Sequence, residues 1–244
     1  RMGNHVDEQI EHHFRQGTSD WTPVSAADIA RLIYKPFSYD SEVSGLCARV
    51  LSAAEVQRSN RFRNEADREH FIQRRAFRRY CAALATGSQQ PLTNLEFSET
   101  GKGQPFLPGL PALSFSFSSC KHGFLGAWSS THQIGIDIED IGRQVDFTSL
   151  ACQYFSVAEA SLVRRMQGRE QNSTFYRYWT LKEAALKCIG EGLPFGLDAF
   201  EFELSPDLQL VTAPIDQGGP ANFSTYVIDG DECCAALVTS NSNA

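Results

Sequence analysis

The stretch GIDIED, residues 135 to 140, places two carboxylates two positions apart inside an alternation of apolar residues. In a β-strand successive side chains point to opposite faces, so Asp137 and Glu139 share one face and the isoleucines share the other. Two like charges about 7 Å apart repel each other unless a cation or several hydrogen-bond donors lie between them. Mg²⁺ is a suitable cation because it binds one or two carboxylates and keeps water and substrate phosphate as further ligands. An edge strand with a solvated acidic face gives the same pattern, so the stretch alone leaves both interpretations open.

The composition of the whole chain is that of a folded protein with one or two domains. The chain has 244 residues, of which 42% are hydrophobic and 21% are charged. No apolar run approaches the roughly 20 residues that a membrane-spanning helix needs, and the start of the chain lacks the apolar core of a signal peptide. The seven cysteines include no CxxC pair, which favours buried thiols in a reducing compartment over zinc ligands or disulfides. We therefore expect a cytoplasmic protein without membrane contact.

The charge of the chain is unevenly distributed. A net charge of −7 argues against a protein that coats nucleic acid, because that affinity depends on many Lys and Arg side chains facing phosphates. Yet residues 58–79 hold eight of the 22 basic residues. This cluster indicates a local anion site or a surface for an acidic partner. A solvated helix face with i,i+4 ion pairs is an equally simple explanation.

The hydrophobic pattern predicts an α+β fold, in which helices accompany antiparallel strands. LSFSFSS, residues 113–119, alternates strictly between apolar residues and serines, and a short turn joins it to the next strand as a hairpin. Residues 1–22 show no sustained period and are expected to form a loosely attached polar arm. Strands are expected at residues 30–37, 113–119, 124–130, 135–140, 200–204, 223–228 and 233–239. Helices are expected at residues 41–51, from an N-cap at Asp67 to Gly87, at 157–167 and at 174–189, with a loop at 100–111.

A second group of functional candidates lies in FYRYWTLKEAALKCIGEGL, residues 175–193. Trp179, Glu183 and Lys187 recur at i, i+4 and i+8, so they share one face of the predicted helix. An exposed Glu–Lys pair at this spacing usually contributes only about 0.3–0.5 kcal/mol to a helix. Together with the acid pair of residues 135–140, however, three acids and a lysine would form a magnesium site that can hold a diphosphate.

These motifs resemble the Sfp-type 4'-phosphopantetheinyl transferases. The family has a strand of the form IGIDIE followed by W-x-x-K-E-x-x-x-K on a helix, and this chain has IGIDIE at 134–139 and WTLKEAALK at 179–187. Further matches are PFLPGLP at 105–111, YFS at 154–156 and GEGL at 190–193. Two motifs in this order and at this distance are specific to the family.

The resemblance implies a fold as well as a site. The family fold is a monomeric pseudo-dimer of two similar halves, each an antiparallel sheet packed with helices, with the active site in the cleft between the halves. On this chain it implies a polar N-terminal arm at 1–22, an N-terminal half at 23–131 and a C-terminal half at 132–244 that carries the metal motif.

The resemblance also implies an activity. Members of the family transfer the 4'-phosphopantetheine arm of coenzyme A to a serine of an apo acyl or peptidyl carrier protein and release adenosine 3',5'-bisphosphate. Position by position, Asp137, Glu139 and Glu183 match the Mg²⁺ ligands, and Mn²⁺ is a possible substitute. Glu183 would also accept the proton of the serine, and Lys187 would hold the diphosphate. A carboxylate and a cation in these places suit the chemistry of phosphoryl transfer.

Two positions depart from the family pattern, and both concern the coenzyme. The family has Ser-His where this chain has Ser118 and Ser119, and a lysine where it has Gln104. Other donors nearby can compensate, because a phosphate needs hydrogen-bond donors rather than one particular residue. The predicted coenzyme-binding residues are Arg58, Arg61, Lys102, Ser118, Ser119, Lys121, His122, Lys182 and Lys187.

The carrier protein is expected to bind around the first helix of the C-terminal half. The predicted contact residues are Val157, Leu162, Val163, Arg164 and Arg165, although a core-facing helix with a charged exterior explains them equally well. Nothing in the sequence distinguishes fatty-acid, polyketide and nonribosomal-peptide carriers. A metal-dependent nuclease of the PD-(D/E)xK kind is disfavoured, because Glu183 and Lys187 have helical spacing and the net charge is negative. A protein that only binds carriers would not need all three acids.

Overall fold

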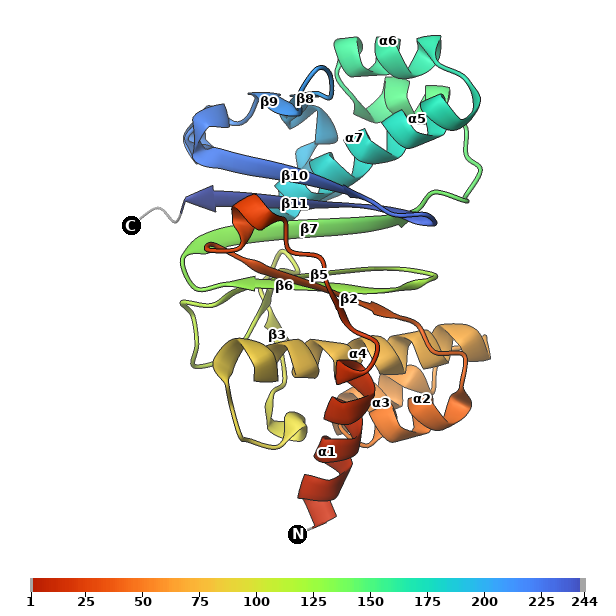
Figure 1. Ribbon diagram of the computed structural model, residues 1–244, viewed down its shortest axis with the longest axis vertical. Coiled ribbons are helices and arrows are strands. Elements are labelled where there is room, and N and C mark those ends of the chain that lie inside the picture. The colour runs from red at the N-terminus through yellow and green to blue at the C-terminus, as the bar shows by residue number, and fades with distance from the viewer. Residues whose placement is uncertain (1, 242–244) are drawn as a thin grey trace.

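The computed structural model describes residues 2–241, with side chains from His5 onward. Strands cross the middle of the molecule, one group of helices lies below them and another lies above them (Figure 1). The lower half is built from the first part of the chain and the upper half from the second part. The predicted α+β fold of two halves, each an antiparallel sheet packed with helices, is confirmed. Among residues 2–241, no helix is both long enough and apolar enough to cross a bilayer.

The N-terminal half contains a four-stranded antiparallel sheet in the order β1-β2-β6-β5. Its strands are β1 (Ser19–Asp20), β2 (Arg31–Pro36), β5 (Ser114–Cys120) and β6 (Gly123–Ser129). A short separate pair is formed by β3 (Ser98–Glu99) and β4 (Pro105–Phe106). The helices are α1 (Met2–Arg15), α2 (Ser41–Ala48), α3 (Ala53–Ser59) and α4 (Glu65–Thr86).

The C-terminal half contains a three-stranded antiparallel sheet in the order β10-β11-β7. Its strands are β7 (His132–Asp140), β10 (Phe223–Asp229) and β11 (Cys233–Asn241). A separate pair is formed by β8 (Glu201–Glu203) and β9 (Gln209–Thr212). The helices are α5 (Phe147–Tyr154), α6 (Val157–Arg165) and α7 (Gly168–Cys188). The long helix α7 packs on β7 and β11 and therefore carries its side chains to the edge of the sheet that faces the other half.

The N-terminal segment is not the loosely attached arm that the sequence predicted. It forms α1, and its Ile10 and Phe14 are fully buried in the core of the N-terminal half. The ring of Phe14 stacks on Tyr80 of α4, with 5.2 Å between the ring centroids. Two apolar residues at i and i+4 were too few to indicate a helix, but they are enough to anchor one. Arg1, the first residue of the predicted arm, lies outside the described residues.

Other differences from the predicted elements concern where helices begin. Helix α4 begins after Asn64, whose side chain accepts hydrogen bonds from the N–H groups of Ala66 and Asp67, so Asp67 is not the N-cap. Its end at Gly87, which has a φ of 60°, agrees with the prediction. Helix α5 and strand β9 were not predicted, and α7 begins at Gly168 rather than near residue 174.

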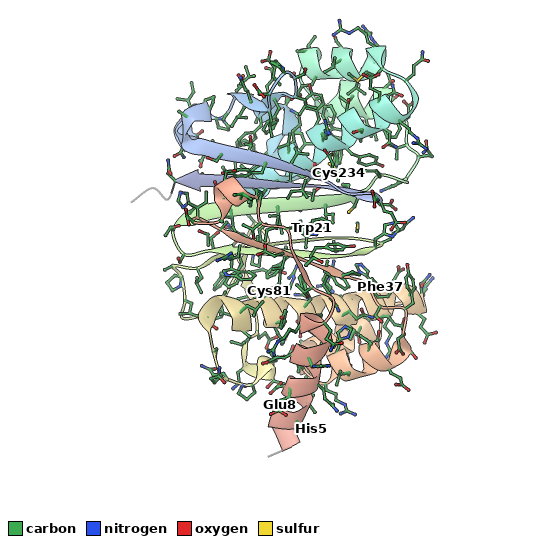
Figure 2. All side chains as sticks on the ribbon, viewed as in Figure 1. His5, Glu8, Trp21, Phe37, Cys81 and Cys234 are labelled. Carbon is green, nitrogen blue, oxygen red and sulfur yellow. The ribbon has the colours of Figure 1, made fainter. Side chains whose placement is uncertain are left out.

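Two different contacts join the halves. The first is an apolar layer between the two sheets. Trp21 packs against this layer and is labelled in Figure 2 near the middle of the molecule, between Cys81 of the N-terminal half and Cys234 of the C-terminal half. The buried members of the layer are Ala26, Ala30, Leu32, Cys120, Leu125, Ala127, Ile134, Ile136, Ile138, Cys233, Ala235 and Leu237. The isoleucine face of β7 is therefore covered by the other half, and the face that carries Asp137 is turned toward α7.

The second contact runs between the edge strands β5 and β7. The hydroxyl oxygens of Ser114 and Ser116 accept hydrogen bonds from the N–H groups of Ile134 and Ile136, at 3.2 and 3.1 Å. Serine side chains thus take the place that backbone carbonyls have in an ordinary ladder. This explains why serines alternate with apolar residues along β5: the phenylalanines enter the N-terminal core, and the serines face the other half.

Candidate active site

Asp137 is the most deeply buried acid of the motif on β7, with 4% of its surface exposed. Its Oδ1 accepts hydrogen bonds from Lys187 Nζ at 2.7 Å and from the Ser118 hydroxyl at 2.8 Å. Within the described chain, its Oδ2 is buried without a hydrogen-bond partner. A buried carboxylate oxygen without a donor is costly, so Asp137 Oδ2 is suited to bind a cation or a further hydrogen-bond donor.

Two further acids lie close to Asp137, one on β7 and one on α7. Burial and the charge of Asp137 raise the pKa of Glu139 to about 7. The same two causes raise the pKa of Glu183, while the ammonium of Lys187 lowers it. Three acids thus surround one lysine, and the group has an excess of negative charge that a second cation would neutralise.

The three acids do not form a ready-made metal site. No group of three His, Cys, Asp or Glu side chains within residues 2–241 is arranged so that it could hold a metal ion. The ammonium of Lys187 lies against Asp137 and already neutralises it in part. The chemistry of the donors nevertheless fits a hard divalent cation, because carboxylate oxygens are its preferred ligands and Asp137 Oδ2 has no hydrogen-bond partner among the described side chains and backbone. The predicted magnesium site therefore stays a prediction.

The acid cluster opens into a cleft between the halves. The cleft has a volume of about 240 Å³. Its walls are formed by Arg78, residues 102–105, residues 115–117, Glu183, Lys187 and residues 190–192. An ion pair between Lys102 and Glu191 connects the two halves beside it. Two carboxylates, three cations and residues of both halves thus line one cavity, and the excess of cations suits an anionic substrate.

Comparison with known proteins agrees with this geometry. The family model of the 4'-phosphopantetheinyl transferase superfamily matches residues 133–238, which include the acid strand and α7. The 4'-phosphopantetheinyl transferase HetI of Nostoc is 32% identical over 202 residues, which cover 81% of this chain and 81% of that protein. The chain belongs to the 4'-phosphopantetheinyl transferase superfamily.

Other members of the superfamily match over shorter stretches. The 4'-phosphopantetheinyl transferase Sfp of Bacillus subtilis is 32% identical over 137 residues, which cover 56% of this chain and 60% of that protein. Among solved structures, a holo-(acyl-carrier-protein) synthase from Bacillus anthracis in complex with CoA (3',5'-ADP) aligns with a TM-score of 0.36 and 17% identity. That alignment covers 46% of this chain and 99% of the synthase.

The residues predicted to bind the coenzyme of this transferase fall into separate groups. Lys102 and Lys187 line the cleft, and Ser118 reaches it through its bonds to Asp137 and Lys187. Arg58 and Arg61 are exposed on and just after α3, outside the cleft walls. The half-buried Ser119 makes no side-chain hydrogen bond within the described part of the chain.

The turn between β5 and β6 carries two more of these residues. Lys121 Nζ lies 3.0 Å from Asp140. The ring nitrogens of His122 lie 3.6 Å from Asp140 and 3.5 Å from Glu232. Both side chains therefore already face carboxylates of the C-terminal half, and neither lines the cleft.

Lys182 corrects one prediction. It is fully buried in the C-terminal half, where its ammonium lies 2.7 Å from Glu159 and donates to the carbonyls of Leu197 and Phe200. Its position on α7 is about 140° around the helix from Lys187, so it faces the core when Lys187 faces the cleft. Lys182 is a structural residue and is not available to a coenzyme in the cleft.

The predicted carrier contacts also need one correction. Val163 is fully buried in the C-terminal core and cannot contact a partner. Val157 is 86% exposed, Arg164 and Arg165 are exposed, and Leu162 is half-buried. The helix that carries them, α6, is the second helix of its half, because α5 precedes it.

Three arginines of α4 were not assigned to the site from the sequence. Arg78 lines the cleft, and Arg74 and Arg75 lie beside it on the same helix. The signal was present, since RRAFRR at 74–79 belongs to the basic cluster of residues 58–79, and positions i, i+1 and i+4 share a helix face. What the sequence could not indicate was that this face turns toward the cleft.

Proposed function

We propose that this 4'-phosphopantetheinyl transferase moves the phosphopantetheine arm of coenzyme A onto a serine of an apo acyl or peptidyl carrier protein. The observation that supports this most directly is the group of Asp137, Glu139, Glu183 and Lys187 in a chain of this superfamily. Glu183 and Lys187 of this group line a cleft between the halves. The products are the holo carrier protein and adenosine 3',5'-bisphosphate.

In the proposed reaction, the serine oxygen attacks the phosphorus that carries the pantetheine arm. The bond from this phosphorus to the bridging oxygen of the diphosphate breaks, and adenosine 3',5'-bisphosphate leaves with that oxygen. Glu183 lines the cleft and is the candidate to accept the serine proton. Lys187 lines the same cleft and can bind the phosphate oxygens as negative charge develops on the leaving group.

Asp137, Glu139 and Glu183 are the residues that would hold a divalent cation, Mg²⁺ or Mn²⁺. When bound, the cation would neutralise the diphosphate and make its phosphorus easier to attack. Asp137 has a buried oxygen free to bind it. Lys187 is bound to Asp137 in this structure and would turn to the diphosphate when Asp137 takes another partner.

Mass spectrometry of an apo carrier protein incubated with coenzyme A, Mg²⁺ and the enzyme tests the proposal. We expect the carrier to gain the mass of one phosphopantetheine group and adenosine 3',5'-bisphosphate to appear in equal amount. A carrier that binds the protein but gains no mass would instead identify a binding protein. A panel of fatty-acid, polyketide and nonribosomal-peptide carriers, compared by kcat/KM, identifies the partner.

The variant Glu183→Gln should lower the rate of transfer by about 10²–10⁴-fold, because it removes the proton acceptor and keeps the shape of the side chain. Its thermal unfolding should match that of the wild-type protein, since Glu183 lies at the cleft wall rather than in the core. Glu203→Gln makes the same change at an exposed glutamate that is not among the cleft-wall residues, so it is the matched control and should leave turnover unchanged. Wild-type turnover in Glu183→Gln would rule out Glu183 as the base.

A further inference from the structure

The outer strand of the C-terminal sheet, β10, has one edge that is not paired. In the order β10-β11-β7, every residue of β10 pairs with β11, on the side that faces the rest of the sheet (Figure 1). On the other side, no backbone hydrogen bond to Phe223–Asp229 is made within the described residues. Successive residues of an antiparallel strand point their N–H and C=O groups to opposite sides. Every second residue of β10 therefore presents these groups at an open edge.

The other edges of the two large sheets are paired or short. The edge strands β5 and β7 contact each other through the hydroxyls of Ser114 and Ser116. The remaining edge strand of the N-terminal sheet, β1, has only two residues. Within residues 2–241, β10 is therefore the long edge of these sheets that stays open.

The edge of β10 lacks the features that keep an open strand from pairing. Such edges are usually protected by lysines, prolines, bulges or very short length. The sequence FSTYVID, residues 223–229, contains no lysine and no proline, and its register with β11 is unbroken. Its one charged residue, Asp229, is neutralised by Arg177, whose Nε lies 3.1 Å from Oδ1. Two copies of this strand would therefore not repel each other.

Both faces of β10 are only half covered by the chain itself. Phe223 and Val227 lie at the border of the C-terminal core, and Tyr226 and Ile228 lie at the border of the apolar layer between the sheets. All four side chains are half-buried. Two apolar layers therefore end at β10. A strand of the same sequence beside it would continue both layers, because its residues alternate between the two faces in the same way.

We propose that β10 pairs with β10 of a second copy of the chain, antiparallel about a two-fold axis, so that the two C-terminal sheets join into one. If all seven residues pair, Tyr226 lies opposite the partner's Tyr226. The contact is isologous, so it covers the open edge of both copies at once, which an unrelated peptide would not do. The family resemblance implies a monomer, and this edge is the feature that predicts otherwise.

The pairing would leave the active site accessible. β10 and β7 are opposite edges of their sheet, and the walls of the cleft include no residue of β10. Two strands of seven residues make a small interface, so we expect a dimer that dissociates on dilution. The two copies would then work independently, with one cleft each.

Sedimentation equilibrium of the full chain over a range of concentrations tests the proposal. One chain has a mass of 27.1 kDa, and the average mass should rise toward twice this value as the concentration increases. Ser224→Lys should weaken association by about tenfold or more, because it places a charge at the exposed edge where the second copy would cover it. A mass of 27.1 kDa at every concentration would overturn the proposal.

Two further variants make the result specific. Gln209→Lys is the matched control, since Gln209 is exposed on β9 of the same half, and it should associate like the wild type. Tyr226→Lys should abolish association, because it sets two like charges directly opposite each other. Thermal unfolding shows whether each variant is folded, and Ser224→Lys remains informative if Tyr226→Lys is unstable. Equal association of wild type and Ser224→Lys contradicts the proposal.

Amide hydrogen exchange shows where the copies meet. Exchange in residues 223–229 should slow as the concentration of the wild-type chain rises, and it should slow less in Ser224→Lys. A dimer in which these amides exchange as fast as in the monomer would have its interface elsewhere, and the proposal would fail. A chain that stays monomeric and protects β10 only when a carrier protein is added would assign the edge to that partner, which also overturns the proposal.

Discussion

Two lysines of α7 have opposite surroundings, although only four residues separate them. Lys187 lies at the cleft, where its ammonium binds Asp137 and approaches the Ser118 hydroxyl. Lys182 is buried among apolar side chains, and its ammonium binds Glu159. Glu159 in turn caps α6 through the N–H of Ser156 and accepts the N–H of Phe202 on β8. The buried pair therefore connects α6, α7 and β8.

Lys182→Met should destabilise the protein by about 3–5 kcal/mol, because it leaves the buried charge of Glu159 without a counter-ion. Urea unfolding measures the loss. Lys102→Met is the matched control, since it removes a lysine from an exposed ion pair worth about 0–1 kcal/mol. The double variant Lys182→Met with Glu159→Gln should lose less than the sum of the two single changes. Equal losses in Lys182→Met and Lys102→Met would contradict the structural role of Lys182.

A pH prediction concerns His13 on α1. Burial, and then the charge of Lys35, lowers its pKa to about 4, while Asp40 raises it. The neutral ring is therefore favoured in the folded protein, and between pH 6.5 and 4 the unfolded chain binds more protons. Stability is thus lost as the pH falls through this range, by about 1–2 kcal/mol when partial solvent exposure is allowed for.

The free energy of unfolding of the wild-type protein and of His13→Gln is measured at pH 7 and at pH 4.5, and the loss between the two pH values is compared. The variant lacks the titrating ring and should lose less stability on acidification than the wild type. His12→Gln, a change at the exposed neighbour, should behave like the wild type. A pH dependence that is identical in all three proteins would show that His13 does not titrate abnormally.

At the residue scale, the sequence could predict which side chains share one face of a helix. It could not predict which part of the molecule that face contacts. Glu183 and Lys187 are four residues apart, so the sequence alone predicts that they lie on the same face of a helix. Lys182 was misassigned because a lysine is expected at a surface, and only the packed structure reveals that Glu159 accompanies it into the core. The arginines at 74, 75 and 78 were missed for the same reason.

At the element scale, the packing of β7 against α7 depends on a single glycine. A Cβ atom on Gly135 would lie 1.9 Å from the carbonyl oxygen of Ala184 and 2.3 Å from the amide nitrogen of Cys188. Both neighbours are backbone atoms of α7, so they cannot move unless the helix moves. The glycine of the IGIDIE motif therefore lets α7 approach closely enough for Glu183 and Lys187 to reach the acids of β7.

Gly135→Ala should destabilise the protein by about 3 kcal/mol, at the upper end of the cost of overpacking, and should lower transfer activity because α7 is displaced. Gly45→Ala is the matched control. Gly45 lies in the interior of α2 with nothing within 4 Å of the added Cβ, so this change should stabilise the protein by about 0.5–1 kcal/mol. Thermal and urea unfolding measure both variants. A stable, active Gly135→Ala would show that α7 can shift at little cost.

The strands were the most predictable elements, because β5 and β7 alternate between two kinds of side chain. Helices with weak patterns were not predictable to the same degree. From His5 onward, where the side chains of α1 are described, only Ile10 and Phe14 are fully buried, and α5 was not recognised at all. The start of α4 was misplaced by three residues, because Asn64 and Asp67 are both good capping residues and only the backbone distinguishes them.

At the scale of the whole molecule, the apolar layer between the sheets makes the halves interdependent. Residues 132–241 alone would expose the buried faces of Ile134, Ile136 and Leu237. Each side chain of this kind stabilises the folded state by about 1.5–3 kcal/mol when it is buried. The three together amount to a large part of the stability of a small domain.

We therefore expect a fragment of residues 132–244 to lack a cooperative thermal transition, whereas the full chain should unfold in one transition. Calorimetry and gel filtration measure the difference. Ile136→Ala in the full chain should cost about 2–5 kcal/mol and should still give one transition. A fragment that unfolds cooperatively as a monomer would show that the halves are independent domains.

The two halves were predictable from the motifs and their family, but the contacts that join them were not. The alternation in LSFSFSS predicts that the serines lie on the outer face of a sheet, but they are outer only with respect to their own sheet and contact the other half. Their partners, Ile134 and Ile136, lie 20 residues farther along the chain, and no local pattern indicates such a pairing. The cleft depends on this arrangement of the halves.

The hydroxyl contacts of Ser114 and Ser116 have a mechanical consequence. A carbonyl is fixed to the backbone, whereas a hydroxyl can rotate and exchange one acceptor or donor for another. The polar contacts along the seam can consequently rearrange without unpairing a strand inside either sheet, at a cost of about 0.5–1.5 kcal/mol for each hydroxyl released, while the apolar layer beside them keeps the two sheets together. Ser116 also lines the cleft, so its hydroxyl can turn toward a molecule bound there while both sheets stay paired.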